Sequence, residues 1–237
     1  MQGIPTPEET AIIATVGSSP FSPPLAYLAI TRMDPEDNRR SWAERDGAYS
    51  PEYYAHIGEN EVSETLATVI EYYAPEDASI LEVGCGSGRH LAHLLDAGYK
   101  DLVGIDINDD SFEVMAEAYP RLADTGTFLA GPIEDLIPEY PDDAYDVVYS
   151  VETLQHVHPD DEWVFEELVR VTGDLLITAE NEGNRPNRGP DAEDVSYVDD
   201  DFPLYHRDWK DVFTDLGLAQ LLVERTNRDT VRVFRAP

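Results

Sequence analysis

The stretch EVGCGSG at residues 82–88 decides the fold, because it joins an apolar, β-rich run to a helical pattern. Glycine occupies alternate positions in it, at Gly84, Gly86 and Gly88. A chain needs glycine where it turns tightly or where its backbone must lie close to a ligand. Ligands of open α/β sheets bind beyond the carboxyl ends of the strands, near helix N-termini. The stretch therefore predicts a ligand site, with an ordinary strand–helix turn as the alternative.

A carboxylate ends the next β-rich run, at Asp106. In a parallel sheet this position lies beside the glycine stretch, and a carboxylate there can accept hydrogen bonds from both hydroxyl groups of a ribose. The alternative is a turn or helix-capping aspartate, although Asn108 or Asp109 could fill that role instead.

The remaining sequence alternates between β-rich runs and helical patterns. Near-continuous apolar strands separated by helices are typical of a parallel sheet covered on both faces. After a final helix the chain carries two β-rich runs around a short polar turn, which predicts a hairpin. We expect an α/β fold, a doubly wound, seven-stranded, mostly parallel sheet with helices on both faces and an antiparallel C-terminal hairpin. The β-rich runs are 79–83, 102–106, 126–130, 145–150, 174–179, 218–224 and 230–235, and helical patterns lie at 60–73, 88–97, 109–119, 160–171 and 206–216.

The chain is expected to form one domain with an N-terminal extension. Residues 1–38 carry Pro, Ser and Thr without periodicity, which predicts a loosely ordered extension. Residues 39–237 are predicted to be a single domain, with a cap segment at 39–75 and a core at 76–237. The polar stretch 181–202 is expected to be a loop, with a substrate lid as one interpretation.

Cellular location can be judged from two features. Prolines interrupt the apolar run at 11–30, so it is a poor signal peptide or membrane span. The single cysteine, Cys85, cannot form an internal disulfide. We expect a cytoplasmic protein without a membrane partner.

The charge is strongly unbalanced, with 49 acidic against 16 basic residues and a formal net charge of −33. Self-repulsion of this size destabilises a compact state unless salt screens it. We interpret the acidity as a halophilic adaptation to a salty cytoplasm. The absence of a basic stripe also argues against a nucleic-acid partner.

Four motifs in order give residues 79–180 a resemblance to the class I (Rossmann-like) S-adenosylmethionine-dependent methyltransferases, in the branch of small-molecule methylators. The first motif, acid-x-Gly-x-Gly-x-Gly, and the acid after the second strand are both present. GPIEDL at 131–136 is similar to the family's third motif, and YDVVYS at 145–150 with LQHV at 154–157 to its fourth. One departure is Pro132, which stands where the family usually has an aspartate beside the adenine.

The resemblance implies S-adenosylmethionine as cofactor and direct in-line transfer of its methyl group to a small-molecule acceptor. His156 and Glu152 follow the fourth strand and are candidates for a general base, with a structural role as the alternative for His156. The aromatic residues Trp42, Tyr49, Tyr53 and Tyr54 are expected to cover the cofactor or to bind a cation against their ring faces, with anchoring of the N-terminal segment as the alternative. The predicted cofactor-binding residues are Glu82, Gly84, Cys85, Gly86, Gly88, Asp106, Ile107, Ile133, Glu134, Ser150 and Val151.

Other functions fit the sequence less well. A catalytically silent S-adenosylmethionine-binding module would keep the same motifs. An NAD-dependent oxidoreductase needs Gly-x-Gly-x-x-Gly, and the sixth position counted from Gly84 is Arg89. His90 and His93 stand three apart on one helix but lack a third ligand, so no metal site is expected.

Overall fold

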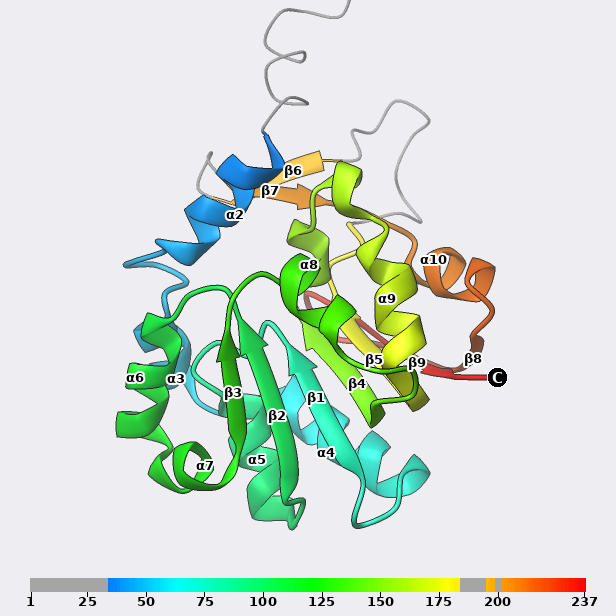
Figure 1. The fold of residues 1–237 in the computed structure, drawn as a ribbon, viewed down its shortest axis with the longest axis horizontal. Coiled ribbons are helices and arrows are strands. Elements are labelled where there is room, and N and C mark those ends of the chain that lie inside the picture. The colour runs from blue at the N-terminus through cyan, green and yellow to red at the C-terminus, as the bar shows by residue number, and fades with distance from the viewer. Residues whose placement is uncertain (1–33, 184–194, 199–201) are drawn as a thin grey trace, which may run out of the picture. The chain divides into compact units, whose positions relative to one another are not determined.

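The apolar runs of the sequence form one seven-stranded sheet in the part of the chain that the computed structural model describes, residues 34–183, 195–198 and 202–237 (Figure 1). Its first five strands are parallel, and the last two complete it as an antiparallel hairpin beside them. In spatial order the strands are β3 (Thr127–Ala130), β2 (Asp101–Asp106), β1 (Ser79–Val83), β4 (Tyr145–Val151), β5 (Thr172–Glu180), β9 (Thr230–Arg235) and β8 (Ala219–Arg225). This sheet confirms the expected fold class.

The order of the strands fixes where a ligand site can form. The chain runs from β1 outward through β2 to β3, and then returns to the other side of β1 as β4. Ile80 of β1 is in register with Leu102 on one side and Val147 on the other. The strand order therefore reverses between β1 and β4, and the crevice at their carboxyl ends is where ligands of such sheets bind.

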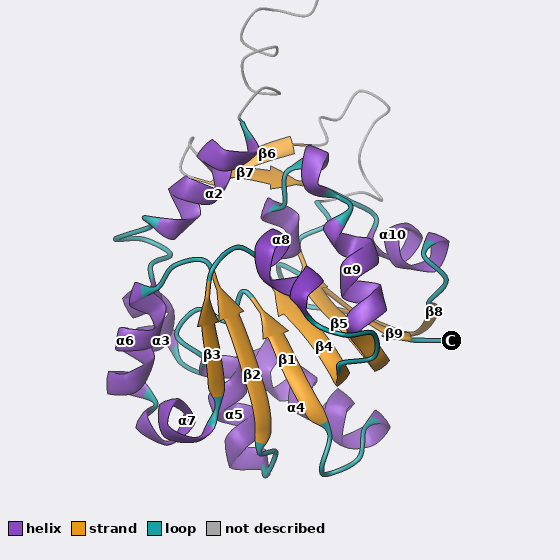
Figure 2. Ribbon diagram, in the orientation of Figure 1, coloured by secondary structure: helices purple, strands orange, loops and turns teal. Residues whose placement is uncertain are grey.

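Helices cover both faces of the sheet (Figure 2). Successive residues of a strand point to opposite faces, so Ile80 packs into one apolar cluster and Leu81 into the other. The first cluster contains residues of α4 (Glu61–Tyr73), α5 (Arg89–Ala97), α6 (Asp110–Ala118) and α7 (Pro120–Thr125). The second contains residues of α8 (Ile133–Leu136), α9 (Val164–Val171) and α10 (Trp209–Asp215). Among the described residues, no helix is long and apolar enough to cross a membrane.

Two of the helices that precede the sheet in the described residues were not predicted. Helix α2 (Pro35–Ala43) begins inside the extension expected for residues 1–38, whose residues 1–33 lie outside the described part of the chain. The side chain of Asp34 accepts a hydrogen bond from the amide of Glu36, and proline at the first helical position needs no partner. Helix α3 (Pro51–Ile57) starts in the same way, with Ser50 as its cap.

A two-stranded sheet corrects the loop expected at 181–202. Strands β6 (Val195–Val198) and β7 (Phe202–Tyr205) pair antiparallel. Each strand has only four residues, and β7 contains Pro203. Strands this short do not show the alternation of apolar and polar residues by which longer strands are recognised. Residues 184–194 and 199–201, to which the lid interpretation also extended, lie outside the described residues.

Candidate active site

The glycine stretch turns from β1 into α5 and lies against the loop that follows β4. Gly84 has a φ of +72°, and a Cβ atom there would lie 2.1 Å from Oγ1 of Thr153. The amides of Gly84 and Cys85 donate to the carbonyl of Ile105 at 2.8 and 2.9 Å. At Gly88, with a φ of +81°, a Cβ atom would meet Leu122 at 2.7 Å. Close packing, together with left-handed backbone, therefore requires glycine at both positions.

Asp106 joins the glycine stretch to the loop after β2. Its Oδ2 accepts from the amide of Gly86 at 2.7 Å, and its Oδ1 from the amide of Asn108 at 2.9 Å and Oγ of Ser111 at 3.3 Å. Burial raises the pKa of Asp106, while these hydrogen bonds lower it. A carboxylate offers about four acceptor positions, so the three bonds leave room for a further donor.

A cavity, here called the main cavity, opens over these loops at the carboxyl ends of β1, β2 and β4. Most of the predicted site residues line it, and two do not. Gly88 packs below the stretch, and Ser150 is buried with its Oγ donating to Glu180 at 2.7 Å. The predicted residues that line the main cavity are Glu82, Gly84, Cys85, Gly86, Asp106, Ile107, Ile133, Glu134, Val151, Glu152 and His156.

Glu82 brings a buried carboxyl group to the floor of the main cavity. Its Oε2 accepts from the hydroxyl of Tyr149 at 2.9 Å, whereas its Oε1 has no hydrogen-bond partner among the described residues. Burial raises the pKa of Glu82 to about 8. Burial also raises the pKa of the neighbouring Cys85 thiol, so this cysteine is protonated at neutral pH and is no nucleophile.

Residues of the N-terminal segment form part of the wall of the main cavity, where aromatic residues that cover a cofactor would lie. Trp42 of α2 packs on the imidazole of His156 with ring centroids 4.2 Å apart. Tyr49 and Tyr54 also line the main cavity, whereas Tyr53 does not. Asn38 was missed in the sequence because it lies in the segment expected to be loose; its Nδ2 donates to the carbonyl of His156 at 2.7 Å.

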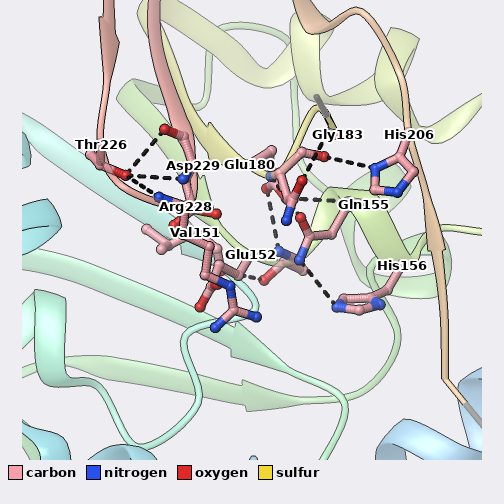
Figure 3. A network of polar contacts seen from close by, with 12 residues as sticks. Val151, Glu152, Gln155, His156, Glu180, Gly183, His206, Thr226, Arg228 and Asp229 are labelled. Atoms are coloured by element: carbon pink, nitrogen blue, oxygen red, sulfur yellow. Dashed lines mark hydrogen bonds and ion pairs between the residues drawn. The ribbon is translucent and has the colours of Figure 1, made fainter. Parts of the chain in front are cut away.

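The loop after β4 is held by a buried carboxylate that the sequence did not single out, Glu180 (Figure 3). Its Oε1 accepts from the amides of Thr153 and Leu154 at 3.3 and 3.1 Å, and its Oε2 from the amide of Gln155 at 3.2 Å. Burial raises the pKa of Glu180 to about 7, although these hydrogen bonds lower it. Because Glu180 ends the apolar strand β5, the sequence pattern shows only where the strand stops, not what its last side chain contacts.

A buried arginine, Arg207, binds backbone carbonyl groups of the same loop. The guanidinium of Arg207 donates to the carbonyls of Leu154 and Val157 at 3.3 and 2.7 Å and pairs with Glu162 at 2.8 Å. The loop carrying Glu152 and His156 is thus fixed from opposite sides, its amides by Glu180 and its carbonyls by Arg207.

His156 is oriented by the β6–β7 hairpin. Its Nδ1 lies 2.9 Å from the carbonyl oxygen of Pro203. A carbonyl only accepts, so Nδ1 carries the proton and Nε2 is the accepting nitrogen. Burial lowers the pKa of His156 to about 4, so the imidazole is neutral at pH 7.

Glu152, which lines the main cavity, has a strained backbone conformation. Its φ is +52°, which is unfavourable for a residue with a side chain. Its Oε1 lies 3.0 Å from Nε of Arg228 in the β8–β9 turn. Burial, together with the charge of Glu152, raises the pKa of the adjacent Asp229 to about 7. Figure 3 shows these three side chains beside the loop that carries His156.

A second hollow adjoins the main cavity. Tyr49, Tyr54, Arg89 and Glu152 line both, so the two concave surfaces share a wall. The remaining residues of the second hollow are Tyr53, Ile57, Asn60, Glu61, Val62, Thr226, Asn227, Arg228 and Asp229.

The two histidines of α5 contact different partners. Nδ1 of His90 lies 2.8 Å from Oγ of Ser63, and Nδ1 of His93 lies 2.9 Å from a carboxylate oxygen of Glu59. Within the described ranges, no group of three His, Cys, Asp or Glu side chains is arranged to hold a metal ion.

Part of the chain is similar in sequence to methyltransferases. Residues 81–174 match the family model described as "Methyltransferase domain". A tRNA U34 carboxymethyltransferase of Shewanella halifaxensis is 36% identical over 115 residues, which are 46% of this chain and 34% of that protein. The chain therefore spans about a third of the length of this curated relative.

Two solved structures share the fold over nearly their whole length. The 1,6-didemethyltoxoflavin-N1-methyltransferase of Burkholderia thailandensis, with bound 1,6-didemethyltoxoflavin and S-adenosylhomocysteine, is 16% identical with a TM-score of 0.59, covering 96% of this chain and 98% of that one. The magnesium protoporphyrin IX methyltransferase of Synechocystis, with bound S-adenosylmethionine, is 14% identical with a TM-score of 0.57, covering 93% and 100%. At these identities the two structures establish the fold.

Proposed function

We propose that this chain, identified by its residues 81–174 as a class I S-adenosylmethionine-dependent methyltransferase, transfers the methyl group of that cofactor to a small-molecule acceptor. The matched domain confirms the family resemblance expected from the sequence. The observation that carries the finer proposal is a single cavity at the strand-order reversal, in which the glycine stretch, Glu82 and Asp106 meet.

The residues of the main cavity fit the cofactor. The unpartnered Oε1 of Glu82 is placed to accept from the ammonium of an amino-acid group. Asp106 has one acceptor position left, which a ribose hydroxyl can fill. We assign the adenine to the space between Ile107 and Ile133, with Glu134 as acceptor for its amino group in place of the missing aspartate at Pro132.

The chemistry asks little of the protein beyond alignment. Bound in this cavity, S-adenosylmethionine supplies a methyl group already made electrophilic by its sulfonium. The fixed loop after β4 holds the acceptor in line and excludes water. His156 is neutral, and its accepting Nε2 lies 3.4 Å from Nε2 of Gln155. A hydroxyl or amine nucleophile that displaces this long contact is oriented by Nε2, which with a pKa of about 4 is a weak base. Glu152 contacts the acceptor from the wall shared with the second hollow.

A small acceptor agrees better with the charge of the chain than RNA does. The tRNA relative matches over only a third of its length, so its substrate does not transfer with the match. Binding of nucleic acid depends on Lys and Arg that neutralise phosphates, and this chain has 16 of them against 49 acidic residues.

The proposal is tested with isotopically labelled S-adenosylmethionine. The full chain is incubated separately with a small-metabolite extract and with bulk tRNA, and label is followed into each fraction. We expect label in a small product, and much less of it with Asp106→Ala when the cofactor is below saturation. Label entering tRNA would overturn the small-acceptor assignment. Binding of S-adenosylhomocysteine without turnover would favour a silent binding module, and thermal stabilisation by NAD rather than by S-adenosylhomocysteine would favour an oxidoreductase.

A further inference from the structure

Arg89, the first residue of α5, is a buried charge without a charged partner. Arg89 comes directly after the glycine stretch in the sequence, and it is 7% exposed. Among the described residues it has no hydrogen bond and no ion pair. Its contact is with the ring of Tyr54, whose centroid lies 4.9 Å from the guanidinium carbon.

Other buried arginines of the structure show what such a group normally requires. Arg232 is bound by both carboxylate oxygens of Glu182, at 2.6 and 2.9 Å. Arg207 has one carboxylate and two carbonyls, as described above. A guanidinium keeps its charge at all physiological pH values and carries five donors, and burying it without acceptors is costly. Arg89, by contrast, has no acceptor among the described residues, and its place on the wall of both concave surfaces leaves its donors open to a ligand.

The acidic residues nearest to Arg89 do not fill that need. Glu82 and Asp229 feel its charge, which lowers the pKa of each, but neither lies within ion-pair distance. The carboxyl group of Glu82 is turned to Tyr149. Burial leaves the pKa of Asp229 near 7 and that of Glu82 near 8, so neither is a full counter-charge at neutral pH.

The surroundings of Arg89 suit a planar anion. Arg89 lines both the main cavity and the second hollow, so a ligand in either reaches it. The N-terminus of α5 starts at the same point, capped by Gly88 without a side-chain acceptor, and adds its partial positive charge. The fork of a guanidinium binds a carboxylate through two parallel hydrogen bonds.

We propose that Arg89 is a carboxylate-binding residue at the junction of the two concave surfaces. The carboxylate has two sources, the amino-acid end of the cofactor or an acidic methyl acceptor in the second hollow. The first source rests on the proposed function; the second rests on the geometry of Arg89 alone.

The test compares matched ligands on wild type and Arg89→Gln by calorimetric titration. S-adenosylhomocysteine carries the carboxylate, and 5′-methylthioadenosine has the same nucleoside without it. Benzoate and the neutral benzamide probe the second hollow in the same way. Arg121→Gln is the control, because Arg121 is an exposed arginine of α7 paired with Asp96. Arg89→Lys keeps the charge and loses the fork.

If the cofactor supplies the carboxylate, Arg89→Gln weakens S-adenosylhomocysteine on the order of 10- to 100-fold and leaves 5′-methylthioadenosine unchanged. If the acceptor supplies it, only the preference for benzoate over benzamide disappears. Equal loss of both adenosine ligands, or unchanged binding of all four, would overturn the proposal. A wild type that binds neither adenosine ligand would refute the proposed function, and the benzoate comparison would still decide the role of Arg89.

Discussion

At the scale of single residues, Asp106 holds two loops and is also the ribose acceptor that we propose, so one substitution would affect both roles together. The sequence suggests a ribose acceptor, with a turn or helix-capping aspartate as the alternative. The structure adds bonds from the amides of Gly86 and Asn108, so the same carboxylate shapes both loops that face the cavity. A variant of Asp106 must therefore be judged by both ligand affinity and stability.

Asp106→Ala is expected to weaken S-adenosylhomocysteine on the order of 10- to 100-fold, because a bond from a ribose hydroxyl to a charged acceptor is lost. It should also lower the melting temperature, since two buried amides lose their acceptor. Titration and thermal unfolding measure the two effects. Asp109→Ala is the matched control, because its side chain makes no capping bond. A folded Asp106→Ala with unchanged affinity would show that the ribose is held elsewhere.

Glu82 predicts a dependence of stability on pH. Its pKa is about 8 in the folded protein and 4.5 as an ordinary side chain, so between these values the folded state binds the proton that the unfolded state has lost. Stability without ligand should fall as pH rises through this window, by up to about 1.4 kcal/mol per unit of pKa shift.

Glu82→Gln tests this dependence, because it removes the titration while keeping the shape. The free energy of unfolding, measured in urea at about pH 5.5 and about pH 8.5, should fall less in the variant than in wild type. Glu180 and Asp229 have raised pKa values of the same sign, and they contribute equally to both proteins. Equal slopes would contradict the assignment to Glu82.

At the scale of elements, the strands and long helices were predictable and the short elements were not. A buried strand such as 145–150 is recognised by its apolar, β-rich composition, and a helix such as 60–73 by the helical spacing of its apolar residues. Helix α2 and the β6–β7 hairpin are too short for periodicity, and their stability comes from packing at the site.

The candidate site divides in the same way. Glu82 and Gly84 lie in one motif and Asp106 ends the next β-rich run, so the sequence reveals all three. Asn38, Glu180 and Arg207 converge on the loop after β4 from three distant parts of the chain, and only the fold brings them together.

Glu180→Gln is expected to loosen the loop after β4, because an amide nitrogen replaces one accepting oxygen and faces a backbone N–H. A lost bond to a charged group amounts to about 1.5–3 kcal/mol of stability. Turnover should fall more than affinity for S-adenosylhomocysteine, since this loop carries His156 and Glu152. Thermal unfolding, titration and the labelled-methyl assay measure the three quantities. Glu167→Gln, in a surface pair with Arg170, is the control. Equal effects on turnover and cofactor affinity would contradict a role in holding this loop.

At the scale of the whole molecule, the dominant property is its negative charge. With 49 acidic residues and 16 basic ones, most carboxylates cannot have a cationic partner. Many of the bases are also committed inside the fold, as Arg207 and Arg232 are. The remaining carboxylates repel one another in the folded state more than in the extended unfolded chain.

Salt should therefore stabilise the protein. The range of electrostatic interactions shrinks from about 10 Å at 0.1 M salt to about 3 Å at 1 M, so screening removes repulsion between separated surface carboxylates first. The melting temperature should rise steadily from about 0.1 to about 2 M potassium chloride. Sucrose at matched osmolality is the control, because it strengthens apolar burial by exclusion from the protein surface without screening charge. A rise in potassium chloride well above that in sucrose identifies screening as the cause. A melting temperature that stays flat or falls with potassium chloride would show that repulsion does not limit this fold, and the acidity would then need another explanation.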